Sequence, residues 1–496
     1  MDMNKFRKIL SLLLASLVLT VGCEDFTDID PQFSQDADNY FVSPADYERA
    51  LIGAYDLLQT SYLSLWIGEI ASDNAIAGGE SVTDTEGLHQ IDAMTHGGVN
   101  AELRNLFRWN YAGITRANYI FENRDNIDFE GKDKILAQAA FLRAYYYFEL
   151  VKFFGDVPLV VDRRLGIDQL SSTPRTPAAE VYAQIEADLT YAAGILDWTD
   201  PQKGRVTKGA ALALLGKAHL YQNEFAEAAT ALDRVINEGP YELYQGDYGD
   251  IFRVVNEGNS EVVFDIQYTG IEGGGYGCFV CLEGFAAPGF HGVRGYEGPI
   301  YGDGNSYNLP TQDLVDAFEE GDPRLEAAVL DIEAFIANNP NEEITYVEGG
   351  GGHTGYYNNK YIKRIDELGP PDTDLTSPLN HIVIRYADVL LMAAEAHAKK
   401  SSPNEEQARQ YLNQVRERVD LDPVTASGTA LIDAIFQERR VELAGEGHRF
   451  FDLVRTGRAA QAIEGFRAGT HEVFPLPQAE IDLSGAGWQQ NPGYNN

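Results

Sequence analysis

The chain has 496 residues, of which 44% are hydrophobic and 23% are charged, enough for one large domain or two to three of average size. Its 76 acidic residues face only 38 Lys and Arg, which gives a formal net charge of −38. A body this acidic repels phosphate backbones, so we expect no nucleic-acid partner. After the N-terminal segment, no apolar run reaches the ~18 residues that a membrane-spanning helix needs.

The N-terminal segment has the layout of a secretory signal. A basic start with Lys5 and Arg7 precedes an apolar run over 9–21, and Cys23 follows almost at once. We predict that residues 1–22 are a signal peptide and that Cys23 carries a lipid, which would anchor the chain to a membrane without spanning it. The alternative is an ordinary signal with an incidental Cys. Acidic residues follow, so residues 23–40 are expected to form a solvated tether.

Helical spacing of apolar residues dominates the first half of the chain. Ser43, Pro44 and Asp46 supply an N-cap, a proline at the first helical position and an acid at the third. Apolar residues spaced three and four apart follow them. The same signals predict further helices over 103–118, 135–150 and 177–195.

Residues 209–240 predict two helices joined by a turn. Small residues at Gly216 and Ala228 would let the two helices approach closely, as in a tetratricopeptide repeat, and Pro240 closes the unit. The alternative is an ordinary helix pair that shows small residues at this spacing by chance.

A second, looser unit of this kind runs from 389 to about 420. Ala396 and Ala408 repeat the twelve-residue separation of the first unit, and Ser402 with Glu405 predicts a capping box between the helices. Further helices are expected over 431–444 and 450–458, before an extended C-terminal coil from Phe474 onward.

The middle of the chain is different in kind. Residues 270–304 hold twelve Gly and six aromatic residues in 35 positions, which prevents a long regular element. A second Gly-rich stretch covers 346–361, and short strand-like runs flank these loops at 261–267 and 380–384. Long irregular loops in a compact body are uncommon and often functional.

Several stretches together resemble the SusD/RagB family of outer-membrane nutrient-binding lipoproteins. They are residues 139–158 (AAFLRAYYYFELVKFFGDVP), 384–396 (IRYADVLLMAAEA) and 437–457 (QERRVELAGEGHRFFDLVRTG), with the tail at 474–477 and 490–494. The acidic tether after a lipidated Cys is similar too. The resemblance covers nearly the whole mature chain.

The resemblance implies a mostly α fold, with tetratricopeptide-like helical repeats and a loop-rich half that carries short strands. We expect one such domain over 41–496, with its helical scaffold at about 41–240 and 384–458 and a ligand-binding part at about 241–383. The resemblance also implies a lipid-anchored protein of the outer-membrane surface that caps a SusC-like TonB-dependent transporter, has no cofactor, binds oligo- or polysaccharide and is not an enzyme. Some members take peptides or other nutrients instead.

A sugar site needs flat aromatic surfaces for the CH-rich faces and polar groups that orient the hydroxyls. The resemblance implies that the loop after the first helices and the later glycine-rich loop form the ligand face. The candidate residues are Trp66, Asp73, Asn74, Tyr276, Phe290, His291, Tyr296 and Tyr301. Trp66 fits a core helix position equally well, the three tyrosines could instead pin the loop to the body, and His291 alone is more typical of a hydrogen-bonded loop residue. Trp109, beside Phe107 in a helical stripe, is expected in the core.

Two other constellations favour structure over chemistry. Cys278 and Cys281 are either free thiols or a disulfide, since zinc would need two further ligands at suitable spacing. The alternating charges over 438–455 are expected to be ion pairs between helices rather than an acid–base site. The sequence contains no nucleophile elbow, phosphate loop or His-Glu-x-x-His helix.

The sequence thus predicts a binding protein for a glycan, most simply a neutral one, that delivers its ligand to the transporter. The alternatives are a binder of peptides or other nutrients on the same fold, and a scaffold that binds no small ligand.

Overall fold

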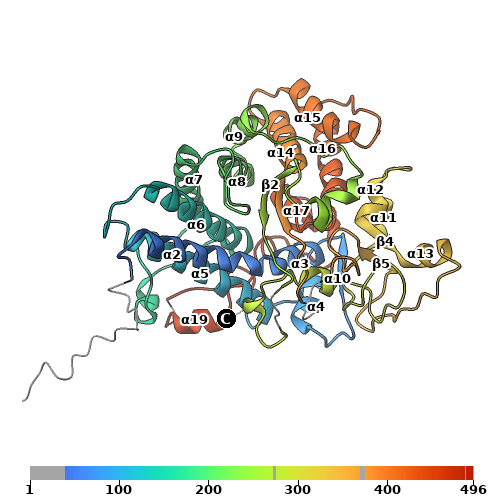
Figure 1. The fold of residues 1–496 in the computed structure, drawn as a ribbon, viewed down its shortest axis with the longest axis horizontal. Helices are drawn as coiled ribbons and strands as arrows, with labels where there is room; N and C mark the ends of the chain where they lie inside the picture. Colours follow the sequence, from blue (N-terminus) through green and yellow to red (C-terminus); the bar gives the residue numbers. More distant parts are fainter. Residues whose placement is uncertain (1–39, 272–274, 369–374, 486, 495–496) are drawn as a thin grey trace, which may run out of the picture.

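The structure is a computed structural model that describes residues 40–271, 275–368, 375–485 and 487–494. The predicted signal peptide, Cys23 and nearly all of the predicted tether lie outside these residues. The helices of residues 101–238 lie to the left, those of 386–442 lie along the top, and the loop-rich segment 287–358 extends to the right (Figure 1). The predicted fold class, mostly α with an irregular half, is confirmed.

The first part of the chain forms a layer of long helices. Asp46 accepts a hydrogen bond of 2.7 Å from the Ser43 N–H, so the predicted N-cap is present. Helix α6 is buried on almost every face, because α5, α7 and α2 pack around it. The helices of this layer are α2 Pro44–Asp56, α3 Tyr62–Ile70, α4 Glu86–Asp92, α5 Ala101–Glu122, α6 Lys132–Phe154 and α7 Ala178–Ile195.

Both predicted helix pairs are present, as α8 Lys208–Tyr221 with α9 Phe225–Glu238 and as α14 Tyr386–Lys399 with α15 Glu405–Glu417. A Cβ atom at Gly216 would lie 2.5 Å from the Leu232 side chain, which explains why α8 carries a glycine there. The predicted capping box between α14 and α15 is wrong. Asn404 caps α15 by accepting from the Gln407 N–H, because the helix begins at Glu405, three residues beyond Ser402.

The two strand-like runs that flank the loops pair with each other. Strands β2 Val262–Ile266 and β6 His381–Arg385 form an antiparallel ribbon, and β6 leads directly into α14. Two more ribbons join β1 Ala75–Gly78 to β3 Tyr307–Pro310, and β4 Val329–Asp331 to β5 Tyr356–Asn358. The β1–β3 ribbon ties the loop-rich part to the body at points far apart in sequence, whereas the β4–β5 ribbon lies within the loop-rich part.

The remaining helices are short, apart from α16 Thr429–Glu442. The C-terminal tail, expected to be extended, contains the short helix α19 Gln478–Leu483. The other short helices are η3 Leu57–Ser61, η4 Ile167–Ser172, η5 Tyr248–Phe252, η6 Val254–Asn256, η7 Phe279–Cys281, α10 Ala287–His291, α11 Gln312–Asp316, α12 Arg324–Ala328, α13 Ile332–Asn338, α17 Arg449–Arg455 and α18 Ala459–Ala462.

The charged segment 438–455 forms ion pairs between helices, as predicted. Arg439 contacts Asp388 of α14 at 2.7 Å and Asp452 of α17 at 3.1 Å. Glu442 accepts from Arg385 and from Arg418, each at 2.5 Å, and all of these groups are buried. With both signs paired and enclosed, the segment is a structural network that joins α14, α16 and α17.

Candidate functional site

The predicted aromatic platform at Trp66 is wrong. Trp66 is only 4% exposed and lies between Phe290 and Tyr307, with ring centroids 5.1 and 4.8 Å away. Phe290 is equally enclosed. Both belong to the main core, where α3, α10 and β3 meet, so neither ring offers a face to a ligand.

The predicted contacts at His291 and Tyr296 are also wrong. His291 is fully buried between the Tyr361 carbonyl and the Asn308 amide, and burial lowers its pKa to about 3, so the imidazole is neutral. Tyr296 donates from its hydroxyl to the Pro299 carbonyl at 2.5 Å and packs inside a small core of the loop-rich part. The physical reason is that irregular loops need their own buried rings to offset the cost of ordering them.

Tyr301 belongs to the same small core but reaches its edge. Its ring packs against Phe335 at 5.3 Å, and its hydroxyl donates to Asn359 at 3.3 Å. It lines one wall of a groove of about 420 Å³ that Phe335 and Tyr356 also line. The ring is 8% exposed, so it shapes this groove more than it presents a stacking surface.

Asp73 and Asn74, predicted to orient sugar hydroxyls, are engaged in structural contacts. Asp73 accepts two hydrogen bonds of 2.7 Å from Arg449, and Asn74 accepts one of 2.9 Å from Arg440. Burial opposes the charge on Asp73, but these arginines hold its pKa below the ordinary value. In this structure Asp73 is thus held by a bidentate partner, and its predicted contact with a ligand, like that of Asn74, stays a prediction.

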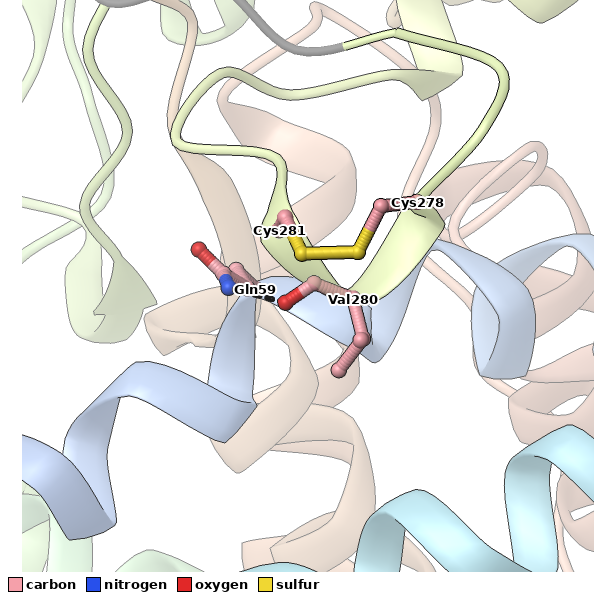
Figure 2. The surroundings of a disulfide bond; sticks show 4 residues. All are labelled: Gln59, Cys278, Val280 and Cys281. Carbon is pink, nitrogen blue, oxygen red and sulfur yellow. Dashed lines mark hydrogen bonds between the residues drawn. A yellow bond between two sulfur atoms is a disulfide. The ribbon is translucent and has the colours of Figure 1, made fainter.

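Tyr276 is the predicted site residue that lies at the surface, with 54% of its side chain exposed. It stands two residues before a disulfide between Cys278 and Cys281, whose Cα atoms are 5.4 Å apart. The disulfide closes the single turn of η7. Figure 2 shows this turn above the start of the chain's helical layer, where Gln59 donates a hydrogen bond of 2.8 Å to the Val280 carbonyl.

Aromatic rings form a continuous row from this turn to helix α5. Centroid distances along the row are 6.1 Å from Tyr276 to Phe279, 6.1 Å from Phe279 to Phe290, 5.7 Å from Phe290 to Tyr62 and 6.5 Å from Tyr62 to Trp109. Phe290 and Tyr62 are buried, whereas Tyr276 is exposed and Phe279 and Trp109 are half-buried. The row therefore has a fixed core and solvent-accessible rings at both ends.

Polar groups of α5 lie beside the Trp109 end of the row. Glu102 and Asn105 precede Trp109 by seven and four residues, so the three share a helix face. Burial near Tyr62 raises the pKa of Glu102, and a hydrogen bond from Asn105 partly opposes this. A carboxylate and an amide next to a half-buried indole can accept and donate hydrogen bonds to ligand hydroxyls while the ring covers an apolar face.

Trp109, expected in the core, packs against it but stays half-buried, and the sequence contains the reason. Phe107 and Tyr111 are four residues apart and share one helix face, whereas Trp109 lies about 200° from Phe107 around the axis. Glu102 and Asn105 mark the polar side to which Trp109 belongs.

Over the residues that the structure describes, every helix is too short or too polar to cross a membrane.

Comparison with known proteins identifies the family of this chain. Residues 260–494 match the family model described as the SusD family, and residues 25–220 match one described as starch-binding associating with outer membrane. SusD-like protein P2 of Formosa agariphila is 29% identical, with 99% of this chain and 100% of that protein covered. SusD-like protein P38 of the same organism is 28% identical over 96% of this chain and 97% of its own length.

Solved structures agree with these matches. A laminarin-binding SusD-like protein is 34% identical, superposes with a TM-score of 0.82, and covers 91% of this chain and 99% of its own. Surface glycan-binding protein A from Bacteroides fluxus is 27% identical with a TM-score of 0.80, over 91% of this chain and 100% of that one. The chain belongs to the SusD family.

Proposed function

We propose that this protein binds a neutral glucan of the laminarin type with the exposed ends of its ring row. The ligand would lie over Tyr276 and Phe279 at one end and Trp109 at the other, with Glu102 and Asn105 orienting its hydroxyls. The observation that carries this proposal is the exposed Tyr276 ring on a turn held by both a disulfide and Gln59. The 34% identical structure named as laminarin-binding supports the choice of glycan.

Physical chemistry favours a neutral ligand and a modest affinity. The net charge of −38 repels uronate and sulfated glycans, and Glu102 adds a carboxyl within the site itself. Each ring that covers a sugar face contributes of the order of 1 kcal/mol, so two or three rings favour an extended oligosaccharide over a monosaccharide. The proposal therefore requires a chain of glucose units long enough to contact both ends of the row.

We also propose that Cys23 carries a lipid and that the protein delivers its glycan to a SusC-like TonB-dependent transporter at the outer-membrane surface. The matching family description, associating with outer membrane, supports this location. Substituting Cys23→Ala should release the protein from the membrane fraction of the native host. After mild detergent extraction, the wild-type protein should co-purify with a large β-barrel transporter, and its recovery alone would contradict this partnership.

Affinity gel electrophoresis on the purified protein tests the glycan. We expect retardation in gels that contain laminarin and none in gels that contain a polyuronate. Tyr276→Ala should abolish most of the retardation, whereas Tyr191→Ala, at an exposed tyrosine of α7 away from the row, should not. Equal mobility in all gels would contradict the proposal, and we expect no shortening of the glycan during incubation because the role is binding.

A further inference from the structure

The turn between α8 and α9 brings a histidine and two carboxylates together. Asn223 adopts a left-handed conformation (φ 62°) just after α8. The Glu224 N–H donates to the His219 carbonyl at 2.9 Å, and the Asn223 N–H donates to the Leu220 carbonyl at 3.1 Å. These two bonds form a Schellman motif, which ends the helix and folds Glu224 back over its last turn.

The residues that this motif brings together are usually apolar, but here they are His219 and Glu224. His219 Nδ1 lies 2.6 Å from a Glu224 carboxylate oxygen and 3.8 Å from a Glu186 oxygen of the neighbouring helix α7. One ligand atom from each of the three residues lies within 4.8 Å of the other two. Within the described ranges, this is the one group of three or more His, Cys, Asp or Glu side chains that meets this criterion.

This donor set has the composition of a zinc site. One imidazole nitrogen and two carboxylate oxygens suit Zn²⁺, which binds them at about 2.0–2.2 Å, and the two carboxylates balance its charge. The Gln222 amide donates at 2.6 Å to Glu186 Oε1, the oxygen that lies 3.8 Å from His219, and holds that carboxylate in place. The side chains of His219, Glu186 and Glu224 are 13%, 28% and 42% exposed, so a metal ion can reach them and a water can complete its coordination.

We propose that His219, Glu224 and Glu186 bind a single Zn²⁺ ion that joins α7 to the α8–α9 turn. Without metal, His219 and Glu224 form the hydrogen-bonded pair described above, and small side-chain rotations separate them enough for an ion to enter. Another His–carboxylate contact, between His397 and Asp233, has one acidic residue only and lacks the third ligand. The site is separate from the ring row, which lies at α3, α5, η7 and α10.

Zinc binding can be measured directly on tag-free protein that has been stripped with a chelator. Isothermal titration with Zn²⁺ in excess Ca²⁺ should show one saturable site, and Co²⁺ should give the visible absorption of a four-coordinate ion with nitrogen and oxygen ligands. Glu186→Gln and His219→Gln should each weaken Zn²⁺ binding at least 10-fold, since loss of outer-shell partners alone costs about 10–100-fold. Glu227→Gln, at an exposed acid of α9 outside the group, is the matched control.

Binding lost in Glu186→Gln and His219→Gln and retained in Glu227→Gln supports the site. The proposal is overturned if Ca²⁺ displaces Zn²⁺ or if no saturable binding occurs. It is also overturned if Glu227→Gln weakens binding as much as the other variants do. Each of these results would indicate diffuse attraction of cations to an acidic surface instead of a specific site. Circular dichroism on each variant confirms that the fold is intact. Glu186→Gln keeps the His219–Glu224 pair, so its loss of binding does not depend on a disturbed turn.

Discussion

The side-chain amide of Gln59 donates a hydrogen bond to the carbonyl of Val280 across 221 residues of sequence. Gln59 is itself held, because the Tyr268 hydroxyl donates to its backbone carbonyl at 2.9 Å. The turn is thus held at Val280 by the hydrogen bond from Gln59 of η3, and at Cys278 and Cys281 by the disulfide. This double fastening places Tyr276 and Phe279 beside the buried rings of the row.

Opening the disulfide should therefore weaken glycan binding more than it weakens the fold. A Cys278→Ser, Cys281→Ser double variant must order the turn on binding, which we expect to lower laminarin affinity about 5- to 30-fold, or 1–2 kcal/mol. Titration calorimetry gives the affinity and thermal unfolding gives the control. An unchanged affinity would show that the turn does not position the rings.

The close contact of α8 and α9 at Gly216 predicts that substitutions at two helical glycines, Gly216 and Gly53, differ in their effect on the free energy of unfolding. A side chain at Gly216 would overlap Leu232, so Gly216→Val should destabilise the protein by about 1–3 kcal/mol. Gly53→Ala, in α2 with open space around it, should be neutral or stabilise by up to ~1 kcal/mol. Urea unfolding of both variants measures the difference, and similar midpoints would contradict the close contact of α8 and α9.

The buried network depends on Glu442. Three arginines, Arg324, Arg385 and Arg418, contact its carboxylate, so Glu442→Gln leaves buried positive charge uncompensated. We expect a loss of roughly 3–5 kcal/mol in the free energy of unfolding. Glu238→Gln breaks an exposed pair with Arg234 and should cost less than about 1 kcal/mol. Comparable losses in the two variants would mean that the network is not enclosed.

Acid should destabilise the protein partly through Glu395. Burial opposes its ionisation, but two hydrogen bonds of 2.8 Å from Arg455 outweigh burial and lower the pKa of Glu395 to about 2. Its folded pKa lies below the unfolded value near 4.5, so its contribution is complete above pH ~5 and is lost as the pH falls toward 2. Glu395→Gln should flatten the stability profile over this range by up to roughly 3 kcal/mol. A profile parallel to that of the wild type would contradict this assignment.

Periodicity predicted the scaffold well because each helix carries its own signal. The cap at Ser43, the stripe over 135–150 and the small residues at Gly216 and Ala228 act within a few residues of sequence, and all appear as expected. The pairing of β2 with β6 joins segments more than one hundred residues apart. No local pattern specifies that partner.

The ligand residues were harder to predict because exposure in an irregular loop has no period. Trp66, Phe290 and Tyr296 looked available in a glycine-rich context, yet each fills a core. Tyr276 differs from them in its neighbours, since it comes just before the turn closed by Cys278 and Cys281 and keeps 54% of its side chain exposed. Whether a loop ring points inward depends on long-range contacts such as that between Gln59 and Val280.

Titration calorimetry with laminarin oligosaccharides on three single-alanine variants tests the central claim most directly. We predict that Tyr276→Ala and Trp109→Ala, at opposite ends of the row, each lower the affinity about 5- to 30-fold at unchanged fold, while Tyr191→Ala leaves it as in the wild type. Full affinity in both row variants would contradict a glycan site on these rings.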